Sequence, residues 1–233
     1  WGYTSVGLAQ SDEEMKEWLT SNKPNWGSKW QAGDVKYKDL TGEGEVTPGA
    51  STLENHGDLK RIGNNSPRYR VGLNLDAAWK GIDFSIFFQG VLKRDWMFDA
   101  GDPYFWGAGS GMWQAACFEE HMDYWTPENT DAYYPKPYFN ETKNQQAQDA
   151  YMQKASYLRC KNIQLGYTLP THITEKAGIS NCRIYLSCDN LFTITGLSSV
   201  YDPEAFGSYD GYGTSGKTYP LQRTISVGVN LNF

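Results

Sequence analysis

The chain has 233 residues and a formal net charge of −6 at pH 7. It contains no cluster of five or more basic residues, and together with the acidic balance this argues against nucleic-acid binding. No run of about 18 apolar residues occurs, so no transmembrane helix is expected. Aromatic residues make up 15% of the chain and glycine occurs 24 times. Because aromatic residues favour strands and gather at the interfaces of membrane barrels, this composition favours an all-β fold.

Candidate strands are segments in which apolar and polar residues alternate with period two. In chain order they lie at residues 1–8 (where the pattern is weak), 69–79, 82–92, 163–169, 182–188 and 225–233. A short helical turn is expected at residues 170–181. The last strand continues to Phe233, at a position where soluble chains usually fray. An aromatic residue at the end of a strand is explained if it lies at a membrane interface.

The clearest pattern predicts a β-hairpin. Odd positions in residues 69–79 are apolar, and after residues 80–81 the apolar positions in residues 82–92 are even. A two-residue turn requires this change of parity, because Trp79 then faces Ile82 and every apolar side chain lies on one side of the ladder.

The lengths of the links between these strands predict the architecture. The links alternate between long and short: residues 10–66, 80–81, 94–155, 170–181 and 195–218. In an up-and-down barrel, alternate links lie on opposite sides, and outer-membrane barrels have short periplasmic turns and long external loops. The sequence therefore predicts an antiparallel up-and-down transmembrane β-barrel in which the long links are extracellular loops.

Seven phrases of the sequence resemble, in order and approximate spacing, the C-terminal region of SusC/RagA-type TonB-dependent transporters. They are GDVKYKDLTGEG (33–44), IGNNSPRY (62–69), WKGIDFSIFFQG (79–90), ASYLRCKNIQLGYTLP (155–170), DNLFT (189–193), YDPE (201–204) and YPLQRT (219–224). The resemblance covers most of the chain beyond residue 30.

This resemblance implies a plugged barrel of roughly 22 strands. Residues 1–233 would supply about the last six strands, and the N-terminal plug and TonB-contacting segment would lie outside this chain. The implied function is TonB-dependent import of oligosaccharides or peptides through the outer membrane of a Gram-negative bacterium, and no enzyme activity is implied. The implied partners are a SusD-like surface lipoprotein, the TonB complex and outer-membrane lipid, and Phe233 matches the terminal aromatic residue recognised during barrel assembly.

One turn is a candidate calcium site. Asp39, Thr41 and Glu43 place oxygen-bearing side chains at alternate positions before Gly44, as in the first half of a calcium loop. Position 12 of such a loop would be Ala50, so the bidentate carboxylate is missing. Calcium is the only cofactor that the sequence suggests, and a glycine-rich external turn is the alternative.

Aromatic residues of one long link are candidates for substrate contact. Tyr104, Phe105, Trp106 and Trp113 concentrate where external ligands would arrive, and aromatic faces can stack on sugar rings. Packing within the loop, or a place in an interfacial girdle, is the alternative.

Three charged residues, Arg68, Arg70 and Asp76, share the polar face of the strand at residues 69–79 and would face the lumen. Lumen-facing polar residues are also the default in barrels. The acidic group around His121 carries no catalytic motif, and a solvated loop is the expectation there.

Two further questions stay open from the sequence. A soluble β-sandwich that binds carbohydrate would show the same strand alternation, and it is the rival to the transporter interpretation. The four cysteines show no metal-site spacing, and either free thiols or one bridge from Cys160 to the strand at 182–188 is compatible with their positions.

Overall fold

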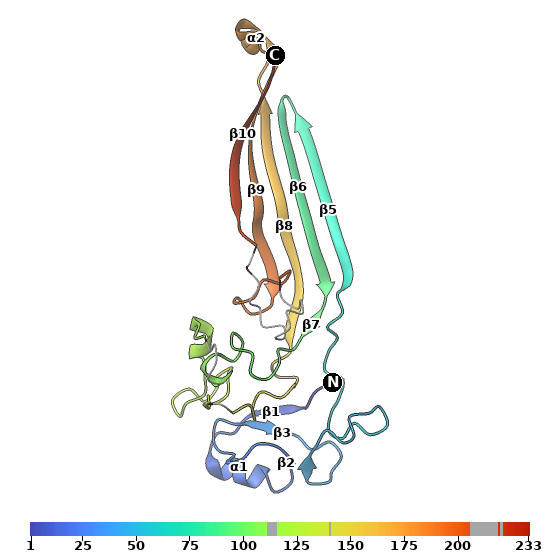
Figure 1. Cartoon of the computed structure of the whole chain (residues 1–233), viewed down its shortest axis with the longest axis vertical. Coiled ribbons are helices and arrows are strands. Elements are labelled where there is room, and N and C mark those ends of the chain that lie inside the picture. The colour runs from blue at the N-terminus through green and yellow to red at the C-terminus, as the bar shows by residue number, and fades with distance from the viewer. Residues whose placement is uncertain (111–115, 140, 206–218, 220) are drawn as a thin grey trace.

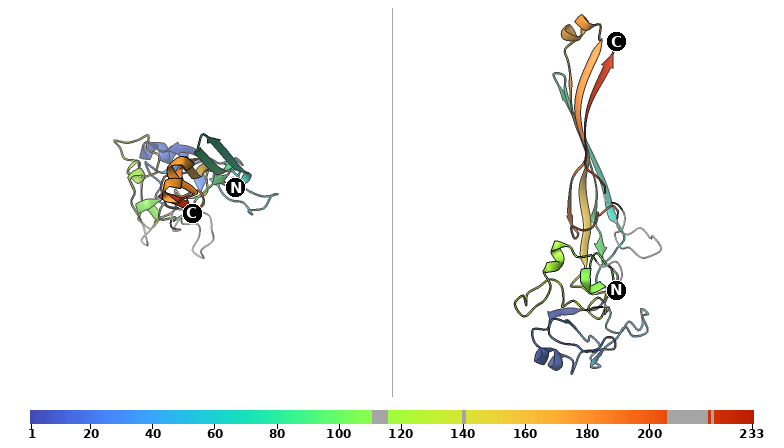
Figure 2. Two further views of the ribbon diagram at one scale, coloured as in Figure 1. Left: turned by 90° about the horizontal axis from the view of Figure 1, so that it is seen from above. Right: turned by 60° about the vertical axis from the view of Figure 1, so that its left-hand side comes forward.

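A computed structural model describes residues 1–110, 116–139, 141–205, 219 and 221–233. A long antiparallel sheet forms one end of the molecule, and a region of loops and short elements forms the other (Figure 1). The further views in Figure 2 show the sheet as a thin, twisted layer. No helix in the described part of the chain has the length and apolar character needed to cross a membrane.

The large sheet has the strand order β10-β9-β8-β6-β5, and each neighbouring pair is antiparallel. A sixth, short strand, β7, pairs with β8 off this path. The bounds are β5 (Arg68–Trp79), β6 (Ile82–Lys93), β7 (Asp95–Trp96), β8 (Gln153–Thr168), β9 (Asn181–Gly196) and β10 (Thr224–Asn232).

The predicted hairpin is confirmed in its register. Trp79 lies opposite Ile82 and Leu73 opposite Phe88, as the change of parity requires. The turn residues Lys80 and Gly81 have φ values of 49° and 86°, so both lie in the left-handed region that a tight hairpin turn needs.

Apolar side chains form transverse rows across all five long strands, on one face of the sheet. Pairing partners in successive rows are Trp79, Ile82, Tyr167, Ile184 and Val229; then Ala77, Phe84, Leu165, Leu186 and Val227; then Leu75, Ile86, Ile163, Cys188 and Ile225. Many of these side chains are exposed, including Trp79 (68%) and Val227 (74%). We call this surface the apolar face.

The opposite face, here called the polar face, carries charged and hydrogen-bonding groups. The Arg183 guanidinium pairs with Asp83 of β6, its Nε donating to Oδ1 over 2.9 Å, and its Nη2 donates to Gln164 Oε1 over 2.8 Å. The sheet therefore has one face suited to an apolar environment and one suited to water, which is the arrangement in a membrane barrel wall.

Short and long connections lie at opposite ends of the sheet, as predicted for the links after residue 79. The hairpin turn, the segment with α2 (Thr171–Thr174) and η3 (Glu175–Ala177), and the C-terminus lie at one end (Figure 1). The described parts of residues 94–152 extend from the other end, here called the loop end. The helical turn predicted at residues 170–181 is confirmed.

Residues 1–8 contain a strand, as expected, but its predicted place in the barrel sheet is wrong. Residues 1–8 do not join the large sheet: β1 (Ser5–Leu8) pairs with β3 (Val35–Tyr37) in a separate two-stranded sheet of the loop region. The segment is held by contacts far along the chain, since Asp149 Oδ1 accepts a hydrogen bond from the Ser5 N–H. The region also contains α1 (Asp12–Trp18), β2 (Lys23–Pro24), β4 (Glu45–Val46), η1 (Gly107–Ser110) and η2 (Glu119–Met122).

The strands β8 and β9 are each 16 residues long and extend further towards the loop end than predicted. The last strand ends at Asn232, and Phe233 follows it with 88% of its side chain exposed. All four cysteines are free.

Candidate functional site

A buried ion network joins the polar face to the loop that follows β9. Arg159 of β8 is 4% exposed, and its Nη2 lies 2.8 Å from Asp202 Oδ1 while its Nε donates to Thr193 Oγ1 over 2.7 Å. Glu204 Oε2 lies 3.0 Å from Lys161 Nζ and 3.5 Å from Arg159 Nη1. Arg159 and Lys161 of β8 thus hold the side chains of Asp202 and Glu204 in the loop.

The Asp202 carboxylate is kept charged by its surroundings. Burial acts to raise its pKa, but the hydrogen bonds from the Glu204 N–H and from Arg159 outweigh burial and hold the pKa below the ordinary value. The Asp202–Arg159 contact therefore persists as an ion pair at neutral pH.

The same loop is anchored on its other side by an aromatic cluster. Tyr201 stacks on Phe98 with ring centroids 4.1 Å apart, and its hydroxyl donates to Asp102 Oδ1 over 2.6 Å. Burial raises the pKa of Asp102 above its ordinary value, although hydrogen bonds from Tyr201, Phe105 and Tyr104 oppose the shift. The segment at residues 201–204 therefore ties the loop region to the sheet.

A hollow of about 680 Å³ opens beside this network at the loop end of the polar face. Its walls come from the starts and ends of β5, β6 and β8 and from the 201–204 segment. The polar residues that line it are Arg70, Gln89, Arg94, Tyr157 and Glu204. Of the predicted lumen-facing residues, Arg70 lines this hollow directly.

The other two predicted lumen-facing residues share the polar face but lie apart along β5. Arg68 pairs with Lys93 at the loop end, and Asp76 pairs with Ser85 towards the hairpin turn. Asp76 accepts a hydrogen bond from Asn74 two residues away. The placement of all three on the polar face agrees with the sequence pattern.

The predicted aromatic contacts are mostly interior. Phe105 is fully buried and Trp106 is 6% exposed, both within the aromatic core of the loop region. Tyr104 is half-buried at the edge of that core, and Trp113 lies outside the described residues. The burial of Phe105 and Trp106 favours the alternative of loop packing for these two residues.

The candidate calcium turn is closed by its own hydrogen bonds. Asp39 accepts from the N–H groups of Gly42 and Gly44 over 2.7 and 2.6 Å and from the Thr41 hydroxyl over 3.1 Å. Burial acts to raise the pKa of Asp39, but these hydrogen bonds outweigh it and lower the pKa. Glu43 is exposed. Within the described ranges, no three or more His, Cys, Asp and Glu side chains gather as a metal site would require.

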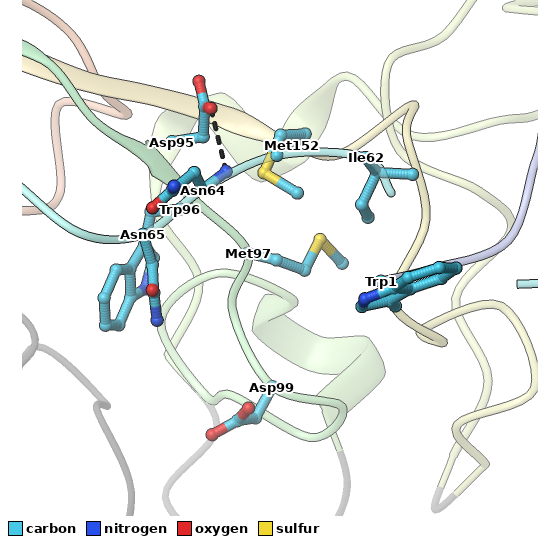
Figure 3. Close-up of a pocket in the computed structure, with 10 residues that line it drawn as sticks. Trp1, Ile62, Asn64, Asn65, Asp95, Trp96, Met97, Asp99 and Met152 are labelled. Atoms are coloured by element: carbon cyan, nitrogen blue, oxygen red, sulfur yellow. Dashed lines mark hydrogen bonds between the residues drawn. The ribbon is translucent and has the colours of Figure 1, made fainter. Parts of the chain in front are cut away.

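A second hollow, of about 450 Å³, lies where residues 1–66 meet the link after β6 (Figure 3). Met97, Met152 and Ile62 extend towards Trp1, and the Asp95 carboxylate accepts a hydrogen bond from the Asn64 N–H over 3.0 Å. The Asp95 N–H in turn donates to the Asn64 carbonyl over 2.9 Å. These two hydrogen bonds hold the segment before β5 against β7. The hollow therefore lies at a contact between two parts of the loop region.

No family model matches the chain. Among curated proteins it is similar to TonB-dependent receptor P3 of Formosa agariphila, with 30% identity over 208 residues that cover 86% of this chain and 19% of the relative. TonB-dependent receptor P26 of the same organism is 26% identical over 208 residues, covering 86% and 20%. The chain is a TonB-dependent receptor homologue. It spans about one fifth of the length of these relatives.

Solved structures agree on the fold of this receptor homologue. The RagAB peptide transporter aligns with a TM-score of 0.62 and 21% identity, over 100% of this chain and 22% of that chain. The RagAB peptide importer in the open-open state aligns with a TM-score of 0.60 and 24% identity over the same shares. The predicted resemblance is confirmed, and so is the prediction of a protein that is not an enzyme, since these receptors are not an enzyme family.

Sequence reasoning did not single out the central residues of this site. Arg94 stood in no quoted phrase, and Arg159, Asp202 and Glu204 were noted only as parts of family phrases. The signal that was available is the acidic pair within YDPE, because a carboxylate that is enclosed on folding requires a basic partner from elsewhere in the fold.

Proposed function

We propose that this chain is the C-terminal part of the wall and external loops of a plugged outer-membrane β-barrel. In this proposal the apolar face contacts lipid and the polar face borders the lumen. The observation that carries the proposal is the continuity of the exposed apolar rows across five long strands. An extended apolar face left in water is costly, and hydrocarbon is the solvent that suits it.

The edges of the sheet support a larger closed barrel. β5 and β10 each have a neighbour on one side only in the described sheet. Hydrocarbon does not tolerate unpaired backbone N–H and C=O groups, so both edges need further strands of the same barrel. The plug and the TonB-contacting segment would belong to the same remainder of the receptor.

The two ends of the sheet support an orientation. The short turns and the C-terminus would face the periplasm and the loop end would face outward, as in outer-membrane barrels generally. The loop region, with its buried aromatic core, then forms a structured external surface on which a SusD-like lipoprotein would sit.

The proposed activity is import of oligosaccharides or peptides, with energy supplied through TonB. The aligned RagAB structures are described as a peptide transporter, and this supports an oligomeric nutrient as the cargo. The charged hollow at the loop end of the polar face would lie along the route from the external surface into the lumen.

The alternative of a soluble carbohydrate-binding sandwich has less support. A sandwich buries the apolar face of one sheet against a second sheet of similar size. Among the described residues, the other sheets are the two-stranded pairs of the loop region. They lie at the loop end and leave the apolar face exposed.

Uptake in a bacterium that carries the receptor tests the proposal. Deleting the gene should abolish uptake of at least one labelled member of a panel of peptides and oligosaccharides, and inactivating TonB should have the same effect. The full-length receptor should fractionate with the outer membrane. Unchanged uptake of the whole panel together with recovery in the soluble fraction would contradict the proposal.

A further inference from the structure

One transverse row on the polar face alternates between long side chains and residues with little or no side chain. The row crosses all five long strands next to the hairpin turn at residues 80–81. From β5 to β10 its members are Ala78, Asp83, Gly166, Tyr185 and Gly228. Residues directly opposite one another on neighbouring strands share a face, so each long side chain of this row has a glycine beside it.

The ring of Tyr185 covers Gly228. A methyl group added at Gly228 would lie 2.2 Å from Tyr185 Cζ and 2.4 Å from the tyrosine hydroxyl oxygen. The far end of the ring therefore lies against the backbone of β10, although the side chain starts from β9. The ring thus lies along the sheet and does not stand up from it.

The ion pair of Arg183 and Asp83 covers the other glycine in the same way. β8 lies between β9 and β6, so the Arg183 side chain crosses β8 before its Nε donates to Asp83 Oδ1 over 2.9 Å. A methyl group added at Gly166 of β8 would lie 2.5 Å from that Oδ1 and 2.6 Å from Arg183 Nη2. Gly166 is buried beneath the pair.

The next row towards the loop end adds little height to this surface. It consists of Asp76, Ser85, Gln164, Ser187 and Ser226. Three of its members are serines, and the Gln164 amide oxygen accepts a hydrogen bond from Arg183 Nη2 over 2.8 Å. The polar face is therefore smooth at the hairpin end, because its longest side chains there lie flat.

A side chain at Gly228 would remove the space in which the Tyr185 ring lies. The tyrosine can respond by rotating, since the clashing atoms are at the free end of its side chain. On the other side of β9, the space above Gly166 is occupied by the Arg183–Asp83 pair, and Arg183 Cζ already lies 4.9 Å from the centroid of the Tyr185 ring. We therefore expect the displaced ring to stand up from the polar face.

We propose that Gly166 and Gly228 are positioning residues for transport, which hold Arg183 and Tyr185 flat against the wall so that the lumen stays clear at its periplasmic exit. The inference rests on the proposed import function, in which the polar face borders the lumen and the hairpin end faces the periplasm. The row lies at the opposite end of the sheet from the loop end, where cargo would bind first (Figure 1). The two glycines therefore govern the rate of passage and not the affinity for cargo.

Uptake by cells that express the full-length receptor tests this role. The probes are a fluorescent oligopeptide and a fluorescent oligosaccharide, and rates are normalised to the receptor found in the outer membrane. Gly228→Ala should lower the maximal rate about threefold or more, while the half-saturating concentration stays within about twofold of wild type. The double variant Gly228→Ala with Tyr185→Ser should regain the rate of Tyr185→Ser alone, because the clash needs both side chains.

The matched control is Gly72→Ala, which adds the same methyl group to the polar face of β5. The nearest atom to that methyl group would be Phe87 Cε2 at 3.5 Å, an ordinary contact, so uptake should not change. Gly166→Ala displaces the Arg183 guanidinium and should lower the maximal rate as Gly228→Ala does, with Arg183→Ser as its rescue.

Nitration of Tyr185 in the purified full-length receptor reports the position of the ring without any transport. Tetranitromethane should modify Tyr185 faster in Gly228→Ala than in wild type or Gly72→Ala, as measured by mass spectrometry of the peptides. Unchanged nitration, or faster nitration with an unchanged maximal rate of uptake, would overturn the proposed role of the glycines. Faster nitration in a receptor whose wild-type form shows no TonB-dependent uptake would refute import itself, and with it the role in transport, while the flat position of the ring would stand.

Discussion

A charge placed on the apolar face at Val227 separates the membrane and soluble interpretations most clearly. Val227 lies near the middle of β10, opposite Leu186 of β9, and 74% of its side chain is exposed. Little packing is therefore lost when it is replaced by Arg. The change in the free energy of unfolding should come almost wholly from the solvent that the new side chain meets.

The expected magnitude depends on that solvent. An arginine on the lipid face of a barrel costs about 2–4 kcal/mol near the midplane and about 0–1 kcal/mol near an interface. The same substitution at an exposed position in water changes stability by about 0.5 kcal/mol or less. Because Val227 is in the second of the transverse rows, inward of the row that contains Trp79 and Tyr167, we expect Val227→Arg to cost about 2–4 kcal/mol.

The assay is denaturant unfolding of the full-length receptor in lipid vesicles, followed by tryptophan fluorescence. The matched control is Ser226→Arg, since Ser226 is the adjacent residue and pairs with Ser187 on the polar face. It should cost about 1 kcal/mol or less. Equal effects of the two variants would refute the assignment of the apolar face to lipid.

Three further outcomes follow from the loop region and its junction with the sheet. Arg159→Met leaves a buried carboxylate unpaired and should cost about 3–5 kcal/mol in the free energy of unfolding, whereas Lys161→Met, which is more exposed, should cost about 1 kcal/mol or less. Folding lowers the pKa of Asp202, so its ion pair stabilises the folded protein fully at pH values above the ordinary pKa of 3.8. This stabilisation is lost as the pH falls through the lowered pKa. Protease cleavage in the loop should therefore rise only below about pH 4. Gly33→Ala should lower the free energy of unfolding by about 2–4 kcal/mol, because φ is +86° and the new methyl group meets the ring of Trp125. The control is Gly42→Ala, where φ is +79° but no atom lies within 4 Å of the new methyl group, and it should cost only about 1 kcal/mol. Both are measured by thermal unfolding. Equal effects within either pair, or cleavage independent of pH, would contradict these contacts.

The hairpin was predictable because its information is local. The change of apolar parity across residues 80–81 fixes both the turn and the register, and no distant contact is needed to choose between alternatives. The same reasoning predicted which side chains of β10 share a face.

The loop-end halves of β8 and β9 were missed because their alternation is interrupted. The pairing of β8 with β6 shifts between Cys160 and Asn162, so the apolar positions of β8, followed along the chain, change from even to odd at that point. β9 compensates with an irregularity at Asn190, where φ is 52°. A period-two search stops at such a bulge although the strand continues.

The loop region was beyond the sequence pattern for a different reason. β1 is placed by contacts with residues more than a hundred positions away, such as the bond from the Ser5 N–H to Asp149. Periodicity carries no information on pairing at that distance. For the same reason the Arg159–Asp202 pair, which joins a strand to a loop, could not be located from the spacing of charges.

The central claim, that the apolar face contacts lipid, is tested most directly by solvent accessibility along β10. Single spin labels are placed in turn at positions 225 to 230 in a cysteine-free form of the full-length receptor in its native membrane. We predict that labels at positions 225, 227 and 229 collide mainly with oxygen dissolved in lipid, and that labels at 226, 228 and 230 collide mainly with a water-soluble nickel complex. Access of the nickel complex to all six positions would contradict it.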